Sequence, residues 1–183
     1  MNRLIRTNIS GRISNSFFQK PTTWVAKNLL GKTLVRKWRG KLIKGIITET
    51  EAYAGPNDRA SHAFRGRTKR TEVMFGGAGT IYVYLIYGMC YCLNIVTEKK
   101  NYPAAVLIRG VLNETGHFDG PGKLTRHFHI DKSLNGKPLG RKTGLWIENG
   151  IKIPASRTKT GKRIGVNYAG RWAKKPWRFY AKI

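Results

Sequence analysis

The feature that most constrains the fold is a pair of adjacent apolar runs in residues 80–98, TIYVYLIYGMCYCLNIVTE. The two runs flank Tyr87, Gly88 and Met89, and apolar runs on either side of a glycine-containing turn are typical of a β-hairpin. Because alternate side chains of a strand point to opposite faces, the tyrosines of the first run share one face and its aliphatic residues take the other. The sequence therefore predicts a hairpin with one aromatic face.

Short strands are predicted along the rest of the chain as well. The runs KTLVRKW, KLIKGIITETEAY and AAVLIRGV read as strands, and the tail holds two more short ones. KPTTWVAKNLLGK and the end of GPGKLTRHFHI predict short helices, while residues 54–79 are rich in loop-forming Gly, Pro, Asn and Asp. The pattern predicts an α+β fold: a single compact domain with a curved antiparallel β-sheet, short helices and a protruding β-hairpin.

The charge of the chain points to a polyanionic partner. Its 183 residues include 35 Lys and Arg but 9 Asp and Glu, which gives a formal net charge of +26. Such an excess of one sign repels itself in a compact domain, and nucleic acid is the commonest polyanion that would neutralise it. We expect residues 1–17 to form a flexible basic N-terminal arm and residues 18–183 to form one domain.

The sequence lacks the patterns of a membrane or secreted protein. It has no run of about 18 apolar residues, and its basic N-terminal residues have no apolar core like that of a signal peptide. Cys90 and Cys92 lie two apart in an expected strand and cannot easily pair with each other, which suggests a reducing compartment. We expect a monomer without membrane contact, cytoplasmic and associated with the nucleoid in a bacterium, or nuclear in a eukaryote.

One predicted strand carries two carboxylates in this otherwise basic chain. Alternation puts four side chains on one face of this strand: Ile47, Glu49, Glu51 and Tyr53. Asp58 and His62 follow in the next loop. A solvated strand face, charge pairing with nearby arginines and general-base chemistry would each account for these carboxylates. A metal-dependent nuclease with Glu49, Glu51 and Asp58 as Mg²⁺ ligands is a further reading, and the local pattern leaves all four open.

The hairpin tip offers a second group of candidate residues. An aromatic side chain at such a tip, here Tyr87, either folds back on its own core or is presented to a partner. On a basic protein the partner could be a base step, since inserted side chains unstack and kink duplex DNA. Asn94 follows on the return strand. Arg109 lies in a later strand, and we expect it either to contact a phosphate or to pair with a carboxylate.

Five segments together resemble a known family. They are ETEAYAGPNDRASHAFRGRT, VMFGGAGTIYVYLIYGMCYCLNIVT, AAVLIRG, GPGKLT and AGRWAKKPWRFY, and they cover nearly the whole chain from about Phe18. In order and spacing they are similar to the 3-methyladenine (alkyladenine) DNA glycosylases. The resemblance implies a monofunctional glycosylase of base excision repair. Such an enzyme flips alkylated or deaminated purines out of double-stranded DNA and hydrolyses the N-glycosidic bond with water, without a metal or other cofactor, leaving an abasic site.

The resemblance also implies roles for seven residues. Glu51 would be the general base that activates water, and Arg109 would help to hold that water. The pocket for the flipped base would be formed by Tyr53, His62, Tyr84 and Asn94, with Asn94 opposing the 2-amino group of normal guanine. Tyr87 would intercalate into the gap left in the duplex. Glu49 is expected to pair with a positive charge instead.

The chain departs from the family pattern at four positions. The family often carries Pro and Asn where this chain has Lys69 and Thr71, and a small residue and His where it has Asn167 and Tyr168. These differences bear on loop packing and on the range of substrates. A non-enzymatic basic module that binds RNA or DNA remains an alternative to both enzymes, although it gives no reason for a carboxylate beside Tyr53.

Overall fold

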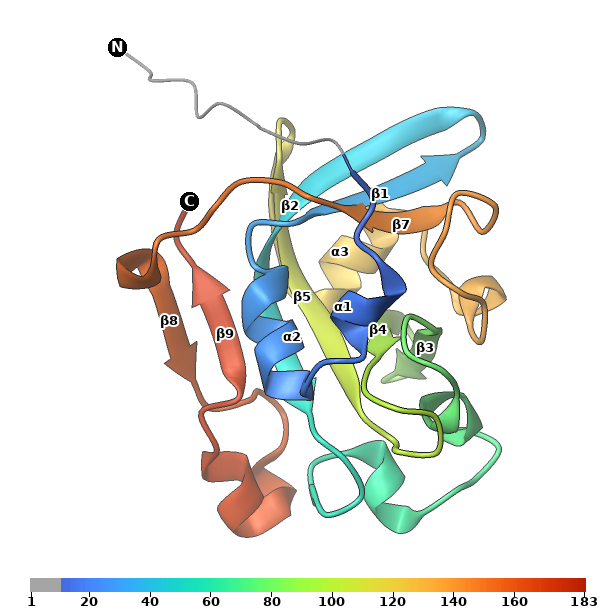
Figure 1. Cartoon of the computed structure of the whole chain (residues 1–183), viewed down its shortest axis with the longest axis vertical. Helices are drawn as coiled ribbons and strands as arrows, with labels where there is room; N and C mark the ends of the chain where they lie inside the picture. Colours follow the sequence, from blue (N-terminus) through green and yellow to red (C-terminus); the bar gives the residue numbers. More distant parts are fainter. Residues whose placement is uncertain (1–10) are drawn as a thin grey trace.

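The computed structural model describes residues 11–183, and its main feature is one antiparallel sheet (Figure 1). The nine strands of the described residues are β1 (Thr33–Trp38), β2 (Lys41–Tyr53), β3 (Ile81–Ile86), β4 (Cys90–Val96), β5 (Ala105–Asn113), β6 (Gly116–Asp119), β7 (Leu145–Glu148), β8 (Thr158–Gly161) and β9 (Arg178–Ala181). The main path through the sheet runs β3-β4-β5-β2-β1-β7. The predicted α+β class with an antiparallel sheet is confirmed.

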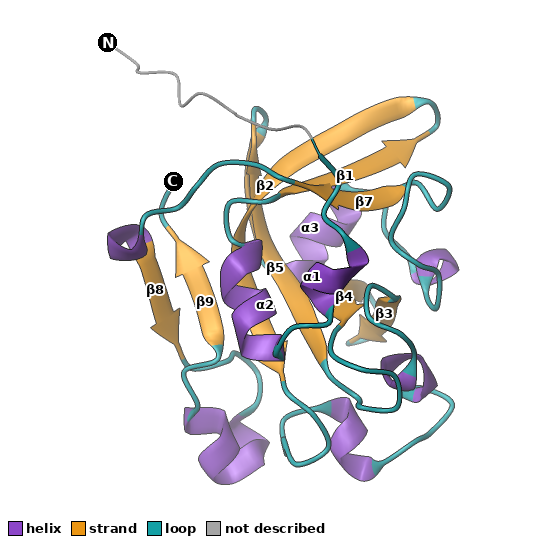
Figure 2. Ribbon diagram, in the orientation of Figure 1, coloured by secondary structure: helices purple, strands orange, loops and turns teal. Residues whose placement is uncertain are grey.

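The helices of the described residues are short, as Figure 2 shows. They are the α-helices α1 (Asn15–Phe18), α2 (Thr22–Leu29) and α3 (Pro121–His127) and the 3-10 helices η1 (His62–Arg65), η2 (Glu72–Phe75), η3 (Lys132–Leu134), η4 (Ala155–Arg157) and η5 (Asn167–Lys174). Helices α2 and α3 bury apolar side chains such as Leu29 and Leu124 in the same core as Val106 of β5. No helix within residues 11–183 is long and apolar enough to span a membrane.

The predicted elements are found with three differences. The hairpin is confirmed, with β3 paired to β4 around residues 87–89, and β2 covers the whole of the predicted run. The tail, however, contains the three strands β7, β8 and β9 instead of two. Strand β6 was not predicted, because four residues are too few to show a period. The loop-rich segment 54–79 contains two 3-10 turns.

The expected N-terminal arm overlaps the described residues only in part. Residues 1–10 of the arm lie outside them. The backbone N–H of Ile13 donates to the carbonyl of Ile147 in β7 at 3.0 Å, and Phe17 packs against the core. Residues 11–17 therefore belong to the folded domain, so the domain begins before the expected residue 18.

Strand β2 is irregular, and this irregularity sets the candidate site. Its register against β5 shifts after Ile47 and shifts back before Thr50, so that Glu49 lies opposite Gly110 while Thr48 on β2 and Arg109 on β5 are skipped. Such a shift changes which side chains share a face. Ile47 consequently lies in the core with Ala52, whereas Glu49 and Glu51 both contact Arg109. The prediction that Ile47 shares a face with the two carboxylates was wrong, because strict alternation does not survive this local shift of register.

The second half of β2 lies inside the sheet. There Glu51 is opposite Leu107 of β5 on one side and Arg178 of β9 on the other. Strand β9 takes the position beside β2 that β1 holds along the first half. A carboxylate in such a central strand is removed from water, so its charge must be balanced by nearby groups.

Candidate active site

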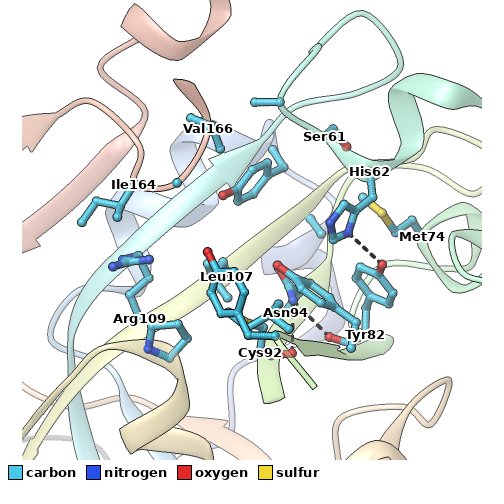
Figure 3. A pocket seen from close by; sticks show the side chains of 18 of the residues that line it. Ser61, His62, Met74, Tyr82, Cys92, Asn94, Leu107, Arg109, Ile164 and Val166 are labelled. Atoms are coloured by element: carbon cyan, nitrogen blue, oxygen red, sulfur yellow. Dashed lines mark hydrogen bonds between the residues drawn. The ribbon is translucent and has the colours of Figure 1, made fainter. Parts of the chain in front are cut away.

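A pocket of about 250 Å³ opens beside the second half of β2. Its lining comes from the loop before η1, from β3, β4 and β5, and from the segment between β8 and η5, and Figure 3 shows side chains from these elements facing one another. The lining residues are Tyr53, Ala60, Ser61, His62, Met74, Tyr82, Tyr84, Ile86, Tyr87, Cys92, Asn94, Ala105, Leu107, Arg109, Pro121, Ile164, Gly165, Val166 and Tyr168. Every predicted site residue except Glu51 is among them.

One wall of the pocket is aromatic and uncharged. His62 and the hydroxyl of Tyr82 form a hydrogen bond of 3.1 Å through Nδ1, and the ring of His62 meets that of Tyr84 edge-on at 4.5 Å. Burial, assisted by the charge of Arg70, lowers the pKa of His62 to about 4. Burial raises the pKa of the Tyr84 phenol. At neutral pH this wall therefore presents neutral rings to the cavity.

Glu51 lies just behind the pocket surface, with no exposed area. Its Oε2 accepts the hydroxyl of Tyr53 at 2.8 Å, and its Oε1 accepts the backbone N–H of Ile164 at 2.8 Å and lies 3.4 Å from Nε of Arg109. Burial raises the pKa of Glu51, and the charge of Arg109 and the two hydrogen bonds oppose this rise. The carboxylate is thus a base of raised basicity whose three partners line the cavity.

Arg109 joins the two carboxylates of β2. Its Nε donates to Oε1 of Glu49 at 3.1 Å, and Nη1 of Arg178 donates to the same oxygen at 3.0 Å. Glu49 thus has the charge-pairing role that was expected. For Arg109 the structure selects carboxylate pairing among its two expected roles, and its place on the pocket lining leaves it available to a ligand as well.

Asn94 and Tyr87 occupy very different places on the hairpin. Asn94 is buried on β4, and its Nδ2 donates to the carbonyls of Tyr82 and Cys92, both at 3.3 Å, which fixes the side chain in the pocket (Figure 3). Tyr87 is 87% exposed at the tip, with a positive φ of 50°. Its ring is therefore not folded back on the core.

Each of the three carboxylates considered as metal ligands is paired with an arginine. Glu49 is engaged by two arginines, and Asp58 forms a buried pair with Arg163. Within residues 11–183 no three His, Cys, Asp or Glu side chains are grouped so as to hold a metal ion. Because each of these carboxylates already has an arginine partner, their arrangement does not support the Mg²⁺-nuclease reading.

Of the four departures from the family pattern, one lies in the pocket. The hydroxyl of Tyr168 donates to the carbonyl of Ala60 at 3.2 Å and so links two parts of the pocket rim. Thr71 is buried and bonds locally to Thr68. Lys69 and Asn167 are exposed and do not line this pocket.

Sequence reasoning missed the segment that closes the pocket opposite the hairpin. Ile164 contributes a backbone N–H to Glu51, and a backbone donor leaves no signal in the residue type. Arg163 beside it pairs with Asp58, 105 positions earlier. In a chain with so many arginines, nothing in the sequence distinguishes this one.

Comparison with known proteins shows the family to which the chain belongs. The family model of methylpurine-DNA glycosylase (MPG) matches residues 16–117 and 112–183. A protein of Methanocella arvoryzae named "Putative 3-methyladenine DNA glycosylase" is 45% identical over 93% of this chain and 92% of its own length. A protein of the same name from Rickettsia conorii is 46% identical over 98% of this chain and 91% of its own length. Another, from Myxococcus xanthus, is 43% identical over 93% of this chain and 90% of its own length. The chain belongs to the methylpurine-DNA glycosylase family.

Proposed function

We propose that this enzyme removes alkylated or deaminated purines from duplex DNA by hydrolysing the N-glycosidic bond, which leaves an abasic site. The observation that carries the proposal is the environment of Glu51. This side chain is a fully buried carboxylate of raised pKa, held by Tyr53, Arg109 and Ile164 directly behind a pocket with aromatic walls. A buried base of this kind beside a base-sized cavity suits the activation of water.

The pocket wall suits a cationic base. A purine alkylated on a ring nitrogen carries positive charge while it is attached to the sugar, and aromatic faces attract cations. The rings of His62 and Tyr84 are neutral at neutral pH, so they add no repulsion. A deaminated purine is uncharged and would depend on stacking and hydrogen bonding alone.

The chemical step has Glu51 as general base. Water bound between Arg109 and Glu51 adds its oxygen to C1′ of the sugar, and its proton passes to the carboxylate. The bond between C1′ and the base nitrogen breaks, and its electron pair leaves with the base. The negative charge of Glu51 stabilises the positive, oxocarbenium-like sugar of the transition state.

Access to a stacked nucleotide requires that it leave the duplex. Tyr87 would fill the gap that the nucleotide leaves, and its exposure at the tip of the hairpin beside the pocket supports this role. The net charge of +26 supplies the attraction to phosphates. We expect one chain to act alone on each lesion, in the compartment that holds the DNA.

The test is release of free base from a duplex that carries 3-methyladenine or hypoxanthine, with and without a chelator such as EDTA. We expect free base together with an alkali-labile abasic site, unaffected by EDTA. Strand cleavage that needs a divalent metal would favour the nuclease, and tight binding without release would favour a binding module. Either result would contradict the proposal.

A further inference from the structure

Arg163 connects the two segments that face each other across the pocket. Its Nη1 and Nη2 both bond the carboxylate of Asp58, the second at 2.9 Å, and both side chains are fully buried. Arg163 directly precedes Ile164, which lines one side of the pocket, and Asp58 belongs to the loop that supplies the other. The ion pair thus joins two pocket walls that are 105 positions apart in the chain.

Asp58 shapes the loop on its side. Its Oδ1 accepts the backbone N–H of Ala60 at 3.1 Å, and its Oδ2 accepts that of Ala54 at 3.3 Å. Ala60 and His62 line the pocket a few residues later. Because both carboxylate oxygens are also bound by Arg163, any movement of the guanidinium is transmitted to this loop.

Arg163 also reaches the strand that carries Glu51. Nη1 donates to the carbonyl of Ala52 at 3.0 Å, and the guanidinium lies 4.9 Å from the ring centre of Tyr53 and 5.1 Å from that of Trp177. Nη2 donates to the carbonyl of Trp172 at 3.0 Å. Stacking between two aromatic rings fixes the plane of the guanidinium and limits the ring of Tyr53.

We propose that Arg163, through its pair with Asp58, is a positioning residue that holds the Ile164 amide and the Tyr53 hydroxyl on the carboxylate of Glu51. The inference rests on the proposed function, because it assigns Arg163 a part in the work of Glu51. Ile164 is the next residue after Arg163, and Tyr53 lies under its guanidinium, so the two hydrogen-bond donors of Glu51 share one support.

Neither stability nor direct electrostatics accounts for this arrangement. A buried ion pair is no more stabilising than well-packed apolar side chains of similar volume, because both charges lose their hydration. The charge of Arg109 is the largest that acts on Glu51, whereas the charge of Arg163 is paired with that of Asp58. Arg163 therefore acts on Glu51 through the atoms that it holds in place.

The test compares Arg163→Gln and Asp58→Asn with a matched control. Arg36 is another buried arginine, 6% exposed, that donates to the carbonyls of Gly144 and His129 and does not line the pocket. Arg36→Gln thus reports the general effect of losing a buried guanidinium. The double variant Asp58→Leu/Arg163→Met, which leaves no unpaired buried charge, serves where a single variant fails to fold.

The first readout needs no activity. In the wild type we expect the amide proton resonance of Ile164, followed by NMR during a pH titration, to move as Glu51 ionises, and this movement should vanish in Glu51→Gln. It should also be lost in the Arg163 and Asp58 variants and retained in Arg36→Gln. The second readout is single-turnover excision, where misplacement of the donors should cost roughly 10²-fold with lesion affinity kept.

The outcomes separate this inference from the proposed function. If the folded Arg163 or double variant keeps both the Ile164 response and the wild-type rate, the positioning role is wrong. Equal losses in Arg36→Gln would show a general structural effect and would also overturn it. If the wild type released no base, the proposed function would fail, while the NMR titration would still decide whether Arg163 holds the Ile164 amide on Glu51.

Discussion

The hydroxyl of Tyr53 donates a hydrogen bond of 2.8 Å to Oε2 of Glu51, two residues earlier on β2. Burial and the neighbouring carboxylate raise the pKa of the Tyr53 phenol well above its ordinary value, so the phenol keeps its proton and remains a donor at neutral pH. In return the hydrogen bond lowers the pKa of Glu51 and partly offsets the effect of burial. The hydrogen bond between the two residues thus favours the ionised form of a buried carboxylate.

Tyr53→Phe should therefore move the acid limb of the pH–rate profile to higher pH. The variant keeps the ring but removes the hydrogen bond that favours the ionised carboxylate, so the pKa of Glu51 rises and less base is available at a given pH. Single-turnover excision measured across pH checks this. Tyr82→Phe is the control, since the Tyr82 hydroxyl bonds His62 and not Glu51. An acid limb that shifts equally in both variants would refute the pairing.

Arg109→Gln should shift the same limb in the same direction. The positive charge of Arg109 is the largest influence that lowers the pKa of Glu51, so its removal lets burial raise that pKa further. Activity that depends on the ionised carboxylate is then lost earlier as the pH falls. Arg109→Lys keeps a positive charge and should retain a limb close to that of the wild type. If the pH–rate profiles of Arg109→Gln and the wild type coincide, the charge of Arg109 does not set the pKa of Glu51 and this prediction is wrong.

Tyr87→Ala should weaken binding to lesion DNA. The exposed ring would no longer fill the gap left by a flipped nucleotide, and stacking by an aromatic side chain contributes about 1–3 kcal/mol, or roughly 5- to 150-fold in affinity. Fluorescence of a reporter base beside the lesion measures flipping directly. Tyr87→Phe keeps the ring and should behave as the wild type. Unchanged affinity and flipping in the alanine variant would remove the hairpin tip from the intercalating role.

Asn94→Ser should raise the release of undamaged guanine relative to hypoxanthine. Two backbone hydrogen bonds hold Asn94 in the pocket, where we expect it to oppose the 2-amino group that distinguishes guanine from hypoxanthine. A clash or an unpaired polar group costs about 1–3 kcal/mol, and relief by a smaller side chain should change the ratio accordingly. Single-turnover rates on matched duplexes give this ratio. If all substrates slow alike, Asn94 serves only the packing of the hairpin.

The sequence predicted best where a residue pattern is local. The bounds of β2 and the β3–β4 hairpin follow from continuous apolar and β-branched runs, and the face shared by Tyr82 and Tyr84 follows from strict alternation. The irregularity after Ile47 was not predictable, because a local shift of register interrupts the alternation without leaving any pattern of its own in the sequence.

The predicted site was incomplete where it depends on distant parts of the chain. Family resemblance supplied Glu51 and its pocket, but the Ile164 amide and the Asp58–Arg163 pair join segments more than a hundred positions apart. Only the folded chain brings them together. The charge pairing of Glu49, in contrast, was predicted from the sequence, because it required no more than a nearby arginine.

The measurement that tests the central claim most directly is single-turnover base release by Glu51→Gln, with lesion binding measured on the same duplex. Glutamine keeps the size of the side chain but cannot take a proton from water. We predict that base release falls to the background rate while lesion affinity stays within a few fold of the wild type. Excision by this variant at a rate near that of the wild type would contradict the role of Glu51 as the general base.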